Sequence, residues 1–117
     1  MVKTEDSQKK IFYIEKGDFL RSMMEFAIRA RGADIYTVDT LENNFYLLDE
    51  LVPDLIIFDV KTVFNQLEEL KKYKNKAHFV AVGDEGDQNL VADFATTFFT
   101  KPLEAKNIAS RLLALLD

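Results

Sequence analysis

The chain has 117 residues, of which 48% are hydrophobic and 30% charged, with a net charge of −5, one histidine and no cysteine. These values fit one globular domain with a real core, and they exclude disulfides, zinc–thiolate sites and histidine-rich metal sites. The negative charge argues against binding to the phosphate backbone of nucleic acids. The polar first residues and the absence of a long apolar run predict neither a signal peptide nor a membrane helix, so we expect a cytoplasmic protein.

Short apolar runs alternate along the chain with segments of helical spacing. The expected strands are Ile11–Ile14, Ile35–Val38, Leu55–Asp59, His78–Val82 and Thr97–Thr100. The expected helices are Asp18–Arg31, Leu41–Leu51, Phe64–Lys72, a short Gln88–Phe94, and Ala105–Leu116. Strict alternation of strand and helix predicts one doubly wound α/β domain, and continuously apolar strands predict a parallel sheet covered on both faces. We expect residues 9–117 to form this domain and residues 1–8 to be a flexible tail.

Three local signals set boundaries between the expected elements. Asp39 followed by Glu42 has the spacing of a capping box that would open the second helix. Gly32 stands where the first helix would end in a left-handed residue. Pro53 stops the second helix and is expected to force Val52 toward extended geometry.

The fold class predicts where a site would lie. In an open parallel sheet, ligands bind beyond the carboxyl ends of the strands, at the point where the strand order reverses. With the order 2-1-3-4-5, that point lies between the first and third strands, where the sequence places Glu15, Lys16 and Asp59. The neighbouring strands end in Gly83-Asp84 and at Lys101. Each residue alone has a plain explanation as a polar strand end, so the signal is their joint placement.

These residues resemble the pattern of receiver domains from bacterial two-component response regulators, the chemotaxis-regulator-like fold, over residues 9–117. The resemblance implies a five-stranded sheet of order 2-1-3-4-5 in a flavodoxin-like three-layer sandwich. It also implies roles for the matching positions, namely an acidic pair at Glu15-Lys16, a phosphoacceptor at Asp59, a hydroxyl position at Gly83, an aromatic switch at Phe98 and a lysine–cis-proline pair at Lys101-Pro102.

The sequence departs from this pattern at two of the functional positions. Lys16 replaces the second carboxylate of the acidic pair, and Gly83 lacks the hydroxyl that would bond a phosphoryl group. Magnesium takes about six oxygen ligands, so an ammonium at a ligand position both removes an oxygen and repels the ion. Glu15 and Asp59 carry −2 while Lys16 and Lys101 carry +2, which makes the four groups neutral without a metal. We therefore expect Lys16 to lie within salt-bridge distance of Asp59.

The favoured interpretation is a degenerate receiver domain, or pseudo-receiver, in which Phe98 keeps one rotamer. It would serve as a phosphorylation-independent protein–protein interaction module, with no enzymatic activity and no cofactor. By the resemblance, its partner would bind the face formed by the fourth helix, fifth strand and fifth helix. An alternative is a true phosphoacceptor, modified on Asp59, with Mg²⁺ held by Glu15, Asp59 and Asp84 while Lys16 swings away. An unrelated small α/β enzyme or nucleotide binder is a third, weaker interpretation, because no GxGxxG motif or P-loop is present.

Overall fold

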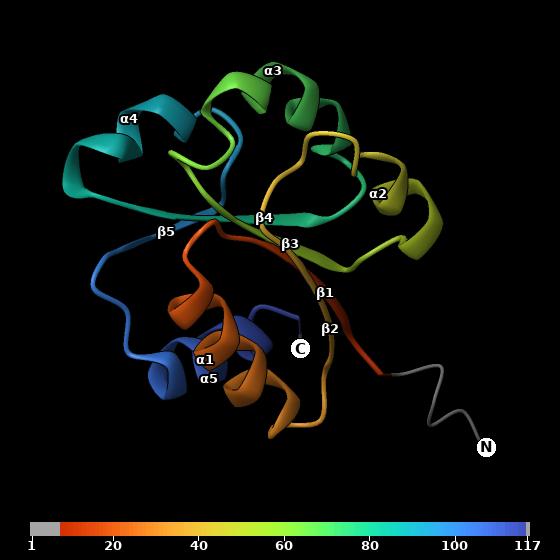
Figure 1. The fold of residues 1–117 in the computed structure, drawn as a ribbon, viewed down its shortest axis with the longest axis vertical. Helices are drawn as coiled ribbons and strands as arrows, with labels where there is room; N and C mark the ends of the chain where they lie inside the picture. The colour runs from red at the N-terminus through yellow and green to blue at the C-terminus, as the bar shows by residue number, and fades with distance from the viewer. Residues whose placement is uncertain (1–7, 117) are drawn as a thin grey trace.

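The computed structural model describes residues 8–116, which form one parallel sheet between two layers of helices (Figure 1). In this part of the chain five strands pair in the order β2-β1-β3-β4-β5, and every pairing is parallel. The strands are β1 (Lys10–Ile14), β2 (Asp34–Val38), β3 (Leu55–Asp59), β4 (His78–Gly83) and β5 (Thr97–Thr100). The expected fold class, strand order and strand positions are confirmed.

Helices α1 and α5 cover one face of the sheet, and α2, α3 and α4 cover the other (Figure 1). Their bounds are α1 (Asp18–Arg29), α2 (Tyr46–Leu51), α3 (Leu67–Leu70), α4 (Gln88–Val91) and α5 (Ala105–Ala114). Single 3-10 turns at Phe64–Gln66, Lys71–Tyr73 and Glu85–Asp87 flank α3 and precede α4. The third helix is thus broken into shorter pieces than predicted, and the short fourth helix is confirmed.

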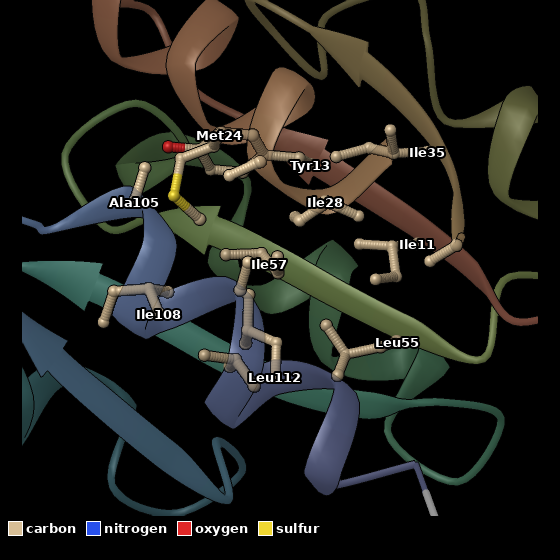
Figure 2. Packing of buried hydrophobic residues seen from close by; sticks show 14 of the residues in the cluster. Ile11, Tyr13, Met24, Ile28, Ile35, Leu55, Ile57, Ala105, Ile108 and Leu112 are labelled. Carbon is tan, nitrogen blue, oxygen red and sulfur yellow. The ribbon is translucent and has the colours of Figure 1, made fainter. Parts of the chain in front are cut away.

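The sheet is buried on both faces because its strands are apolar on both sides. All five residues of β3 are buried, as are the last four of β1. Figure 2 shows the core on the α1 and α5 side, where Ile11 and Ile57 of the sheet meet Ile28 of α1 and Leu112 of α5. Each large side chain fully buried in this way contributes roughly 1.5–3 kcal/mol. Packing therefore fixes the strand ends firmly enough to position a site.

Two of the predicted helix boundaries are wrong. Residues 42–45 form turns, α2 begins only at Tyr46, and no capping box forms at Asp39, because the Thr40 hydroxyl instead accepts the backbone N–H of Glu42 at 3.1 Å. Val52 is left-handed, with φ 46° and ψ 63°, and not extended, because its N–H still bonds the Leu48 carbonyl as the chain leaves α2.

The end of α1 and the start of the described chain follow the sequence more closely. Gly32 has φ 89°, so the predicted left-handed glycine is confirmed. Of the predicted tail 1–8, residues 1–7 lie outside the described part of the chain. Gln8 is described, and its side-chain amide donates a hydrogen bond to the Gly32 carbonyl at 3.2 Å. No helix within residues 8–116 is long and apolar enough to span a membrane.

Candidate functional site

Three charged side chains meet at the carboxyl edge of the sheet because parallel strands end on the same side. Lys101, directly after β5, places its Nζ 2.8 Å from Asp59 Oδ1, and 3.1 and 3.3 Å from Glu15 Oε1 and Oε2. Both carboxylates are buried, with Glu15 3% and Asp59 7% exposed. Burial lowers the pKa of Lys101, but hydrogen bonds to Asp59 and Glu15 outweigh it and raise the pKa above its ordinary value. Lys101 is therefore the cation that pairs with both buried carboxylates.

Tyr13 supports Glu15 from within the sheet. It is fully buried on β1, and its hydroxyl donates to Glu15 Oε1 at 3.4 Å. Burial and the neighbouring Glu15 carboxylate raise the pKa of the Tyr13 phenol far above its ordinary range, so the hydroxyl stays protonated and available as a donor. The Gly17 N–H donates to the other oxygen of Glu15 at 3.0 Å. Both oxygens of Glu15 are thus bonded within the protein.

Thr62 binds the second oxygen of Asp59, and this residue was not among the site residues predicted from the sequence. Its hydroxyl and its backbone N–H donate to Asp59 Oδ2 at 2.7 and 3.1 Å. The Thr62 hydroxyl in turn accepts the N–H of Lys16 at 3.1 Å, which ties the loop after β3 to the loop after β1. The available signal was the spacing Asp59-x-x-Thr62, because an Asp side chain readily bonds backbone N–H groups two or three residues on.

The prediction that Lys16 pairs with Asp59 is wrong. The Lys16 side chain is exposed, and among the described residues Asp59 forms its ion pair with Lys101. The backbone of Lys16 is held against Thr62 while its ammonium extends into water, where it stays solvated. Glu15, Asp59 and Lys101 therefore form a group with a net charge of −1, in place of the neutral set of four expected from the sequence.

Gly83 ends β4, and a carboxylate occupies the space beside it. A Cβ added to Gly83 would lie 2.8 Å from Asp87 Oδ2 and 3.2 Å from Asp87 Cβ. Asp87 is 8% exposed, and its Oδ2 accepts the N–H of Asp84 at 2.9 Å in a reciprocal capping box. The position to which the sequence resemblance assigns a hydroxyl is therefore closed by the Asp87 side chain.

Asp84 does not complete a metal site with Glu15 and Asp59. Its Oδ2 lies 2.5 Å from Lys61 Nζ in an exposed ion pair. The hydrogen bond and charge of Lys61 lower the pKa of Asp84, and Asp84 raises the pKa of Lys61 in the same way. Within residues 8–116 no three acidic, histidine or cysteine side chains are placed to hold a metal ion. Two carboxylates already bonded to protein donors do not fit the oxygen-rich coordination of Mg²⁺.

The remaining predicted positions lie around this edge. The Lys101-Pro102 bond is cis, as expected. Phe98 of β5 is half-buried and packs against the core on the α2–α4 side of the sheet. Within the described residues, Glu15, Asp59 and Lys101 come together, whereas Lys16, Gly83 and Asp84 make their contacts with other groups.

The fold is that of response regulator receiver domains. An orphan response regulator of H. pylori, HP1043, superposes with a TM-score of 0.80 at 20% identity, over 93% of this chain and 97% of that one. The chemotaxis response regulator CheY4 of Vibrio cholerae gives a TM-score of 0.78 at 18% identity, over 93% and 99% of the two chains.

A third structure is described as belonging to a family of redox sensors in the streptococci that evolved from two-component response regulators. It gives a TM-score of 0.78 at 19% identity, over 92% of this chain and 50% of that one. No family model matches the sequence, and no curated protein matches it either. At these identities the structures define the fold of this chain.

Proposed function

We propose that this chain is a receiver-like domain of a cytoplasmic bacterial two-component pathway that acts without phosphorylation. In this role it binds a protein partner in one fixed conformation, catalyses no reaction and needs no metal cofactor. The receiver fold supports the signalling role. The redox sensors that evolved from response regulators support the idea that this fold can respond to a signal other than phosphorylation.

The observation that carries the proposal is the complete internal bonding of Asp59. Lys101 holds Oδ1, and two donors of Thr62 hold Oδ2. A phosphoacceptor must present a carboxylate oxygen to the incoming phosphorus, with a metal ion to neutralise the charge on the transferring oxygens. Attack through Oδ2 would first break two hydrogen bonds at a buried carboxylate, and charged hydrogen bonds of this kind are worth about 1.5–3 kcal/mol each.

A titration with Mg²⁺ and beryllofluoride, followed by amide NMR, tests this proposal. We expect no saturable shifts at the amides of Asp59, Thr62 and Lys101. Lys16→Asp is the matched comparison, because it restores the second carboxylate of the acidic pair without touching the bonds of Asp59. Saturable shifts centred on Asp59 in the natural chain would overturn the proposal.

The alternative of a phosphoacceptor needs a test of its own, because one of its two requirements is met. Lys16 already extends into solvent, as that interpretation requires, although Asp84 is held by Lys61. Incubation with a small-molecule phosphodonor, followed by intact-protein mass spectrometry, separates the two functions. Phosphorylation of the natural chain that is lost in Asp59→Asn would establish the alternative. No phosphorylation of either the natural chain or Lys61→Ala, which frees Asp84, would support the pseudo-receiver.

For the partner we propose the face formed by α4, β5 and α5. The Arg111 guanidinium of α5 lies 4.6 Å from the Phe99 ring, so Arg111 is on the β5 side of the helix. Ala114 is exposed and three residues further on, so it lies on the same side as Arg111. Ala114→Glu should weaken partner binding, whereas Asp59→Asn and the exposed α2 variant Glu50→Lys should leave it intact. Affinity for the pathway partner, measured for all three variants, is the test. Loss of binding in Asp59→Asn with the fold retained would mean that phosphorylation matters.

A further inference from the structure

The two most exposed large apolar side chains of residues 8–116, Phe19 and Phe26, lie on α1, and Met23 of the same helix is also exposed. Phe19 is 78% exposed, Phe26 77% and Met23 44%. A different side of the same helix is buried, through Met24, Ala27 and Ile28. Among residues 8–116 nothing covers this second apolar side. On the α4–β5–α5 face the exposed large apolar residues are less prominent, at 44% for Leu90 and 36% for Leu115.

The exposed residues of α1 follow the spacing of a coiled-coil seam. Phe19, Met23, Phe26 and Ala30 are separated by four, three and four positions, which is the d-a-d-a pattern of a heptad. Ala30 is exposed and still helical in its backbone, and its N–H bonds the Phe26 carbonyl at 3.0 Å. We call these four residues the α1 seam. Its pattern fits packing against another helix, along the whole length of α1, more closely than it fits binding of a small molecule.

The charges beside the seam on one copy complement the same charges on a second, antiparallel copy. Asp18 and Arg29 stand eleven residues apart, about three helical turns, so they lie on the same side of α1 at opposite ends. Their side chains are 87% and 58% exposed. Within the helix they pair with Arg21 and Glu25, and both pairs lie at the surface. A second α1 in antiparallel orientation brings the Arg29 of each copy to the Asp18 of the other, which satisfies a two-fold axis.

We propose that the α1 seam is a self-association surface, on which α1 packs antiparallel against α1 of a second copy. In this arrangement Met23 of each copy faces Phe26 of the other, and Phe19 faces Ala30. The two outer pairs therefore place a large ring against a small methyl group, and the two central pairs place the Met23 thioether against the Phe26 ring. This surface is separate from the α4–β5–α5 face, and it does not depend on the state of Asp59.

The size of the seam predicts a weak dimer. A phenylalanine at least three-quarters exposed leaves on the order of 150 Å² uncovered, so four such rings across two copies supply about 600 Å². With the flanking residues, the interface stays below the roughly 1,200 Å² of a standard specific complex. Self-association in the micromolar-to-millimolar range is the expected behaviour.

Sedimentation analysis over a wide range of protein concentration tests the surface. The natural chain should show a concentration-dependent rise in mean mass, and Phe26→Glu should weaken the association at least tenfold. Phe64→Glu is the matched control, because Phe64 is 55% exposed and lies on the other side of the sheet. A chain that stays monomeric into the millimolar range, or a Phe26→Glu variant that associates normally, would overturn the proposal.

Cross-linking tests the orientation, and it is simple here because the chain has no cysteine. Phe19→Cys and Ala30→Cys, which lie about 16 Å apart along one helix, are prepared separately, one of them tagged, and treated with a short bis-maleimide alone and as a mixture. Antiparallel pairing predicts that the mixed dimer forms several-fold more than either variant linked to itself. A parallel dimer would instead link each variant to itself, and no linking despite association would place the interface elsewhere. Either result would refute the arrangement.

Discussion

Replacement of Gly83 by alanine should destabilise the protein through its contact with Asp87. Gly83 is not among the left-handed residues, so alanine can adopt its backbone geometry. The new methyl would lie 2.8 Å from Asp87 Oδ2, and such overpacking costs about 1–3 kcal/mol. If Asp87 moves away, the cap on the Asp84 N–H is lost at a cost of about 1 kcal/mol. Because one or the other cost applies, we expect a loss of about 1–3 kcal/mol, or about 4–12 °C in Tm for a chain of this length.

A double-mutant cycle measured by urea unfolding isolates this contact. Asp87→Ala alone should cost about 1 kcal/mol, as a lost cap. The Gly83→Ala, Asp87→Ala double variant should be more stable than the sum of the single losses predicts, by at least about 1 kcal/mol. Gly86→Ala is the control, because a Cβ there meets nothing within 4 Å. Additive losses, or a neutral Gly83→Ala, would refute the view that Asp87 closes the hydroxyl position.

Other predictions concern the charged group and its neighbours. Lys101→Met should cost about 3–5 kcal/mol in urea unfolding, because it leaves the Glu15 and Asp59 carboxylates buried without a cation; a loss below 1 kcal/mol would contradict this role. Thr62→Val should cost about 1–3 kcal/mol, while Thr62→Ser, which keeps the hydroxyl, should stay close to the natural chain. The pKa values of Tyr13 and Lys101 are both raised above their ordinary 10.0 and 10.5, so the folded state holds more protons than the unfolded state at alkaline pH. The contribution of these two groups to the free energy of unfolding should be complete below about pH 10 and should be lost as the pH rises further. When unfolding is measured across the alkaline range, Tyr13→Phe should lose less of this free energy than the natural chain.

Much of the fold could be predicted because a sheet buried on both faces requires strands that are continuously apolar, and such runs are visible in the sequence. Leu55–Asp59 and Thr97–Thr100 have the predicted bounds in the structure, and the other strands differ by one residue at one end. The start of α2 could not be predicted as reliably, because a short polar side chain decided it. Thr40 took the Glu42 N–H that the Asp39 capping box required. A true capping box of the same kind lay unnoticed at Asp84 and Asp87.

The candidate site could be predicted as far as topology determines it. Glu15, Asp59 and Lys101 meet because their strands end at one edge, and this follows from strand order alone. The position of Lys16 depended on a competition that the sequence does not show. Lys101 reaches both carboxylates, and Thr62 holds the remaining oxygen of Asp59, so Lys16 gains nothing by leaving water.

The bridge through Lys101 also has a consequence for the order of events in folding. Its ammonium joins the ends of β1, β3 and β5, and its two partners lie 86 and 42 positions earlier in the chain. Contacts this distant must wait until the chain between them has been organised, because closing a long loop is entropically costly. The bridge should therefore form after the rate-limiting step, so that Lys101→Met accelerates unfolding and leaves the refolding rate almost unchanged in stopped-flow measurements. The charged group at the carboxyl edge of the sheet would then determine how long the folded domain lasts.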